Sequence, residues 1–230
     1  MLLSSATHTR LSATVIALMS VLSGSVDNAD LAAQVSRPET ANVLYETGTK
    51  RGVFEDWSLS STPDWQRLKG MLLNDGTRGG AGFAPIFAPY RPTSADYAVE
   101  AEIRVIREGN SFGVVVRADI QPDGRKVGYA VGMGQNLARP VQRSTTICYL
   151  NGVMSPFIRN DCIGEGEIFP PGTDWHIYRI EANGNEIRLL IDKKVIINMR
   201  DNRFLSAGRV GLWSSEYQLE VRNFKVIALN

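Results

Sequence analysis

The stretch that decides the fold is residues 97–118, which read YAVEAEIRVIREGNSFGVVVRA. From Tyr97 to Val105 apolar residues occupy every second position, and mostly charged residues lie between them. Phe112 to Ala118 repeat this alternation after the Glu108-Gly109-Asn110 triplet. Side chains of a strand point to opposite faces in turn, so a period of two predicts strands, and the triplet has turn-forming residues. The stretch therefore predicts two antiparallel strands joined by a turn.

The same period continues to the end of the chain. It predicts further strands at 127–133, 147–150, 153–158, 175–181, 186–191, 195–199, 209–213 and 217–227, with turns at 122–124, 183–185 and 192–194. No helical period follows residue 50, and no repeat of fixed length is present. About a dozen short strands at this spacing predict an all-β sandwich or barrel.

Composition excludes several classes of function. The 230 residues carry a net charge of +1, so no basic field exists to hold nucleic acid. Of the two histidines only His176 lies in the predicted domain, which excludes a multi-histidine metal site.

The N-terminus resembles an export signal. Residues 11–22 are an apolar run after Arg10, and the small residues Ser23, Gly24 and Ser25 follow. We therefore expect a signal peptide or membrane anchor at 1–25, a linker at 26–49 and the β domain at 50–230. The alternatives are cleavage at Ser25, an uncleaved anchor helix, which would be the protein's one membrane contact, and an apolar tail of no targeting role. The first two place the domain outside the cytoplasm, secreted or anchored.

Two cysteines fit that location. Cys148 and Cys162 flank an Asn151-Gly152 pair, the strongest short-range hairpin signal, which would bring their strands together. A disulfide is expected in an exported protein, and two buried free thiols are the alternative.

Several segments resemble concanavalin A-like jelly rolls, and more specifically the laminin G-like and 3-keto-disaccharide hydrolase-like domains of exported bacterial proteins. The resemblance rests on 95–102, 111–117, 128–131, 175–181, 183–187, 191–195, 208–213 and 221–226. It implies two stacked antiparallel sheets over 50–230, with an outer face where relatives often bind glycans. The hydrolase-like members carry a Gln and a His after a Gly-x-x-Gly-Leu step, where Trp213, Ser214 and Ser215 stand here. Inherited catalysis is therefore not expected.

One pair of carboxylates is a weak candidate for catalysis. Glu100 and Glu102 share one face of a strand, as paired acids of a glycosidase must. However, the Glu-x-Asp-x-x-Glu pattern of laminarinase-type relatives is missing. We expect these residues to form ion pairs with arginines such as Arg104, Arg117 or Arg179.

The candidate ligand-binding residues are Arg117, Tyr129, Arg179 and Trp213. Alternation places Arg117 and Trp213 on the outer face, where an indole can stack on a sugar and a guanidinium can donate to hydroxyls. The alternative is an aromatic ring covered by a loop and an arginine at a strand edge. Trp57 is expected in the core, and Trp175 is expected to pack.

Other features carry weaker signals. Asp119, Asp123, Asp192 and Asp201 lie in turns and allow a structural calcium, but no compact Asp-x-Asp-x-Asp loop is present. The glycines at 79–82 and 132–134 lack a following helix and predict loops or corners, not a phosphate site.

The sequence thus predicts an exported, non-catalytic domain that binds carbohydrate or a cell-surface glycan, without a cofactor. The alternatives are a glycan or 3-keto-disaccharide hydrolase, and a sensory or accessory ectodomain that contacts other proteins.

Overall fold

The computed structural model describes residues 42–47, 54–59, 64–76, 85–135, 143–151 and 162–229. The chain divides into two units, Met1–Thr40 and Ala41–Asn230, and all described residues belong to the second. The expected signal or anchor at 1–25, the strand expected at 153–158 and the glycines at 79–82 lie outside the described residues. In the described part, no helix has the length and apolarity to cross a membrane.

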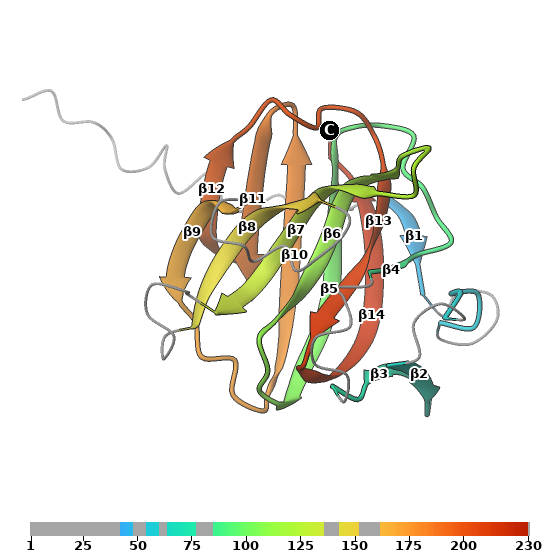
Figure 1. Cartoon of the computed structure of the whole chain (residues 1–230), viewed down its shortest axis with the longest axis vertical. Helices are drawn as coiled ribbons and strands as arrows, with labels where there is room; N and C mark the ends of the chain where they lie inside the picture. Colours follow the sequence, from blue (N-terminus) through green and yellow to red (C-terminus); the bar gives the residue numbers. More distant parts are fainter. Residues whose placement is uncertain are drawn as a thin grey trace, which may run out of the picture. The chain divides into compact units, whose positions relative to one another are not determined.

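The domain is a sandwich of two antiparallel sheets, drawn one behind the other in Figure 1. Sheet A has the order β12 (Lys194–Arg200), β11 (Glu186–Ile191), β10 (Trp175–Asn183), β5 (Tyr97–Arg107), β14 (Gln218–Ala228), β3 (Met71–Asn74) and β2 (Trp65–Leu68), and β1 (Val43–Glu46) also pairs with β14. Sheet B has the order β4 (Ile86–Phe87), β13 (Arg209–Ser215), β6 (Ser111–Ile120), β7 (Lys126–Gln135), β8 (Arg143–Asn151) and β9 (Cys162–Ile168). The predicted all-β sandwich is confirmed.

Most of the predicted strands begin and end within two residues of the observed bounds, and β8 begins four residues earlier than predicted. Strands β1 to β4 have two to four residues and were not predicted, since so few positions show no period. Strand β1 lies before residue 50, in the expected linker, and pairs with β14. The glycines at 132–134, expected in a loop or corner, lie inside β7.

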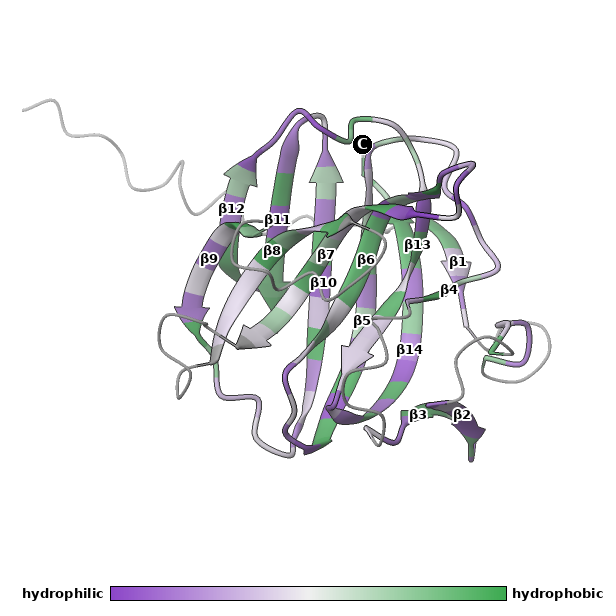
Figure 2. Ribbon diagram, viewed as in Figure 1, coloured by the Kyte–Doolittle hydropathy of each residue, from purple (hydrophilic) through white to green (hydrophobic). Residues whose placement is uncertain are grey.

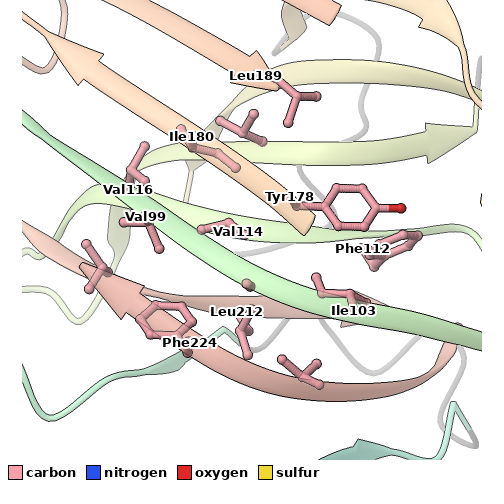
Figure 3. Close-up of a cluster of buried hydrophobic side chains, with 14 of the residues drawn as sticks. Val99, Ile103, Phe112, Val114, Val116, Tyr178, Ile180, Leu189, Leu212 and Phe224 are labelled. Carbon is pink, nitrogen blue, oxygen red and sulfur yellow. The ribbon is translucent and has the colours of Figure 1, made fainter. Parts of the chain in front are cut away.

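The core lies between the two sheets (Figure 3). Val99 and Ile103 of β5 and Ile180 of β10 face Val114 and Val116 of β6, and all are at most 1% exposed. Phe112 lies edge-on to Tyr178, with ring centroids 5.4 Å apart. Trp57, predicted in the core, is 1% exposed and packs edge-on against Phe224.

The two outer faces differ in chemistry. Strands β10, β11 and β14 of sheet A alternate between purple and green in Figure 2, whereas the middle parts of β6 and β7 are green and white. On sheet A the outward side chains are mostly charged and partly exposed. On sheet B a second buried apolar cluster lies on the outer side, formed by Val115, Ala118, Ala130, Leu150 and Trp213. Sheet B is thus buried on both faces where β6, β7 and β8 run.

A disulfide joins β8 to β9. Cys148 and Cys162 are cross-strand partners and their sulfur atoms are bonded, as predicted. The bond is consistent with a location outside the cytoplasm. The predicted Asn151-Gly152 turn lies partly outside the described residues, because Gly152 is not among them.

Candidate functional site

The outer side of β7 is almost free of side chains. Tyr129, Val131 and Met133 point into the core. The residues that alternate with them point outward, and these are Gly128, Ala130, Gly132 and Gly134. We call these four residues the β7 strip. Four successive outward positions with nothing larger than a methyl group expose the strand backbone to any neighbouring group.

The close contact between β6 and β7 requires glycine at two positions. Gly132 and Gly113 are cross-strand partners on β7 and β6. A Cβ atom on Gly132 would lie 2.2 Å from the carbonyl oxygen of Phe112, and one on Gly113 would lie 2.1 Å from that of Val131. Both contacts are with backbone atoms, which cannot move aside. The bare surface of the strip is therefore built into the sheet.

Trp213 borders the strip on the β6 side. The register places Trp213 beside Gly113, which in turn lies beside Gly132. The ring belongs to the outer apolar cluster, with Val115 and Ala130. Trp213 thus lies on the outer face, where alternation placed it, but it is 1% exposed, so the strip is enclosed and not an open surface.

Two hydroxyls border the strip on the β8 side. Ser144 and Thr146 are the partners of Gly134 and Gly132, and they point outward because Ile147 points into the core. Ser144 is 3% exposed and Thr146 is 7% exposed, and neither hydroxyl has a hydrogen-bond partner among the described residues. A buried polar group without a partner costs about 1–3 kcal/mol. These two buried oxygens are therefore free to hydrogen-bond to a further polar group at the strip.

Arg117 does not project from the outer face, contrary to expectation. The register of β6 shifts after Val116, and Arg117 takes a positive φ of 50°. This turns its guanidinium into the end of the sandwich, where the side chain is fully buried. There the guanidinium donates to the carbonyl oxygens of Ala95 (2.9 Å), Gly184 (2.8 Å) and Phe204 (3.0 Å). Its donors join three loops and are not available to a ligand.

Tyr129 faces inward beside the same loops. Its hydroxyl donates to Asp201 (2.7 Å), and Tyr149 donates to the other oxygen of that carboxylate (2.6 Å). Burial alone would raise the pKa of Asp201, but the hydrogen bonds from Tyr149 and Tyr129 outweigh it and hold the pKa below its usual value. The backbone of Phe204 links this network to Arg117. Two of the four candidate residues thus come together, as a support of the sandwich end.

Arg179 lies on the other sheet. On the outer face of sheet A its guanidinium donates to Glu100 (2.9 Å) and Glu181 (2.8 Å). The expected ion pair between Glu100 and an arginine is therefore confirmed for Arg179. Arg179 does not meet Trp213, which lies on the outer face of sheet B.

Glu102, the second carboxylate of the weak catalytic pair, is also held by its neighbours. It accepts hydrogen bonds from Arg222 and from Asn223 (2.7 Å), and the bond from Arg222 is the main cause of its lowered pKa. A general acid of a glycosidase needs a raised pKa, so Glu102 is unsuited to that role. Nearby, Trp175 packs under the guanidinium groups of Arg104 (4.9 Å) and Arg222 (4.2 Å).

The acidic turn residues are engaged separately. Asp123 pairs with Arg125 (2.6 Å), Asp192 accepts from the Ile177 amide (2.9 Å), and Asp119 lies 3.7 Å from Arg91. In the described ranges no group of three His, Cys, Asp or Glu side chains is placed to hold a metal ion.

Residues 53–227 match the model of a family described as the 3-keto-alpha-glucoside-1,2-lyase-like domain. The chain belongs to this family. The match covers both sheets of the sandwich apart from β1 and the last residue of β14. No curated protein matches the chain in sequence.

Solved structures share the fold at low sequence identity. The carbohydrate-binding module CBM66 from Bacillus subtilis is similar with a TM-score of 0.54 and 18% identity, over 71% of this chain and 91% of that one. A Bacillus subtilis protein of unknown function with a galectin-like fold has a TM-score of 0.58 and 12% identity, over 81% and 96%. The carbohydrate recognition domain of Emp46p has a TM-score of 0.51 and 13% identity, over 76% and 88%. The domain thus shares its β-sandwich fold with these proteins.

The sequence placed Trp213 on the outer face but did not point to Ser144, Thr146 or the β7 strip. The signal was present as small residues at every second position from Gly128 to Gly134. The Gly-Met-Gly triplet at 132–134 locally resembles a loop, and only the core residues on either side show that the strand continues.

Proposed function

We propose that the protein is an exported, non-catalytic domain that binds a glycan along the β7 strip. The observation that carries this proposal is the pair of buried hydroxyls, on Ser144 and Thr146, that border a bare strand and have no partner among the described residues. A site that is only packed against apolar groups would be more stable with Ala and Val at these positions. Sugar hydroxyls are donors and acceptors that match both oxygens.

The other border supports the same ligand. Trp213 supplies a flat apolar ring at the edge of the strip, and an indole packs well on the apolar face of a sugar. Gly113 and Gly132 lie in register between Trp213 and Thr146 and present no side chain there. Several structures with this fold are carbohydrate-binding domains by their descriptions, which fits the proposal.

Residues outside the strip favour binding over catalysis. Trp213, Ser214 and Ser215 stand where the resemblance expects a Gln and a His. Hydrolysis of a glycoside needs two converging carboxyl groups, and Glu100 and Glu102 lie on sheet A, each bonded to an arginine. Family membership favours a second candidate, a lyase acting on 3-keto-α-glucosides. Incubation with a 3-keto disaccharide, followed by analysis of the products, tests that candidate directly.

The first prediction concerns Thr146. Thr146→Val keeps the shape of the side chain and removes the hydroxyl, so glycan affinity should fall by about tenfold or more while the protein is as stable as wild type or more so. A glycan array of neutral and acidic oligosaccharides identifies a ligand, titration calorimetry gives its affinity, and urea unfolding gives the free energy of unfolding.

Thr145→Val is the matched control. Thr145 is the chain neighbour of Thr146, and its hydroxyl donates to the Glu167 carbonyl oxygen (3.1 Å). This variant should lose about 1 kcal/mol of stability and keep its glycan affinity. The proposal is contradicted if wild type binds no glycan on the array, or if the Thr146→Val variant binds the glycan as tightly as wild type does. Trp213→Ala is less informative, since loss of a buried indole costs about 3–5 kcal/mol in any case.

A further inference from the structure

The row of outward residues on β7 begins with Lys126, two positions before Gly128. Lys126 is partly buried, and among the described residues it has no carboxylate, carbonyl or aromatic partner. Every other buried or partly buried arginine, lysine or histidine whose side chain is described has such a partner, as Arg117, Arg179 and Lys225 illustrate. Lys126 thus differs from the other buried or partly buried cationic side chains that are described, which all have a partner.

The surroundings of Lys126 explain why no anion of the described residues reaches it. Its cross-strand partner is Ile120, and the next outward residue of β8 on that side is Leu150, the partner of Gly128. The nearest acidic residues along the chain are engaged elsewhere, because Asp119 lies beside Arg91 and Asp123 bonds to Arg125. Burial lowers the pKa of Lys126, as expected for an ammonium group without a counter-ion.

A partly buried ammonium group without a counter-ion lowers the stability of the fold unless an anion binds to it. Transfer of an ammonium group out of water is unfavourable, and an apolar residue of the same length would fit the apolar neighbours better. Lys126 pairs with Ile120, which lies two positions after Ala118 of the outer apolar cluster, so alternation places Lys126 on the side of sheet B that carries the β7 strip and Trp213. Its charge is therefore placed toward any ligand that lies along β7.

We propose that Lys126 binds an acidic group of the glycan, so that the ligand is an oligosaccharide carrying a carboxylate or a sulfate. This inference rests on the proposed function of the strip. Lys126 and Gly132 are six residues apart on one strand, or about 20 Å between Cα atoms. A ligand that meets both Lys126 and the Trp213 end is longer than a single sugar. The acidic group binds at the Lys126 end, and neutral rings lie on the glycines.

The experiment compares acidic and neutral ligands on the full chain. Wild type and Lys126→Met are screened on an array that carries neutral, uronate-bearing and sulfated oligosaccharides, and are then titrated with α-1,4-trigalacturonate and α-1,4-galactotriose. We expect wild type to prefer acidic glycans and Lys126→Met to bind them about tenfold to a hundredfold more weakly, with neutral glycans unaffected. The uronate and sulfate arms of the array identify which acidic group is bound. The preference should also weaken as salt is raised.

Lys193→Met is the control, because Lys193 is an exposed cation in the turn between β11 and β12. It should bind every glycan as wild type does. Lys126→Met should melt at the same or a higher temperature, so a loss of affinity cannot be assigned to unfolding. Retention of neutral glycans alone, or equal binding of acidic glycans by Lys126→Met, overturns this inference and leaves the proposed function standing. Failure of every glycan to bind wild type overturns both.

Discussion

Single residues in this domain differ most from expectation where the backbone is irregular. Alternation along β6 places Arg117 outward with Gly113 and Val115, but the register shift after Val116 changes its direction. Nothing in the residue types marks that shift, and the guanidinium that it buries bonds to three loops that meet at the sandwich end. A positive φ at an arginine is strained, and the bonds to Ala95, Gly184 and Phe204 hold it in place.

Arg117 therefore gives a prediction about stability. Arg117→Met leaves three carbonyl oxygens without their donor in a buried place, so the free energy of unfolding should fall by about 3 kcal/mol or more. Urea unfolding followed by tryptophan fluorescence measures the loss. Arg125→Met, in an exposed ion pair with Asp123, should change stability by less than about 1 kcal/mol. Equal effects of the two substitutions would show that the Arg117 bonds do not form.

At the scale of elements, most strands of six or more residues were predictable, and strands β1 to β4, with two to four residues, were not. Strand β9 (Cys162–Ile168) was missed although it is long, because its Gly164 and Gly166 occupy the inward positions where apolar side chains would mark a strand. A Cβ on Gly164 would lie 2.9 Å from the sulfur of Met199, so β12 fills the space that those side chains would take. The candidate site was missed for a similar reason. A bare strand has no side chains to give a pattern, and the hydroxyls beside it gain meaning only when their burial is known.

The disulfide between β8 and β9 gives a prediction at this scale. The bond closes a loop with a sequence separation of 14 residues, and cross-linking a loop of that size stabilises by about 3 kcal/mol in the chain-entropy model. In a variant with both Cys148→Ala and Cys162→Ala, urea unfolding should give a free energy of unfolding about 3 kcal/mol below that of wild type. Wild type treated with a reducing agent should match the variant. Thiol titration of denatured, unreduced wild type should find no free thiol. Two free thiols, or a variant as stable as wild type, would contradict the predicted contribution.

The whole molecule uses its two outer faces differently. On sheet A, carboxylates and guanidinium groups bond to each other across β11, β10, β5 and β14, although the Nε atoms of Arg188 and Arg222 have no hydrogen-bond partner there among the described residues. On sheet B, the outer face holds the unpartnered hydroxyls of Ser144 and Thr146. The sequence indicated a sandwich with a glycan-binding face, but the choice between faces depends on which polar groups remain unsatisfied. That is a property of the assembled sheets.

Burial of tyrosines throughout the domain predicts its response to alkaline pH. Burial raises the pKa of Tyr45, Tyr97 and Tyr149 from 10.0 to about 12, and it raises those of Tyr129 and Tyr178 further. In the unfolded chain these phenols ionise near pH 10, so the folded state binds their protons more tightly. Their contribution to stability is therefore complete below pH 10 and is lost as the pH rises toward 12 and beyond. For Tyr97 alone a change of this size corresponds to about 3 kcal/mol.

The melting temperature should accordingly be nearly constant between pH 7 and 9 and should fall steeply above pH 10. Most of the tyrosinate absorbance near 295 nm should appear together with unfolding, since five of the seven tyrosines have raised pKa values. Tyr97→Phe removes one buried phenol, so its stability should depend less on pH over this range, although it loses the hydrogen bond from the Arg117 amide (2.7 Å). Smooth titration of the phenols near pH 10 in a protein that remains folded would mean that water reaches them, and the packing described for both ends of the sandwich would then be wrong.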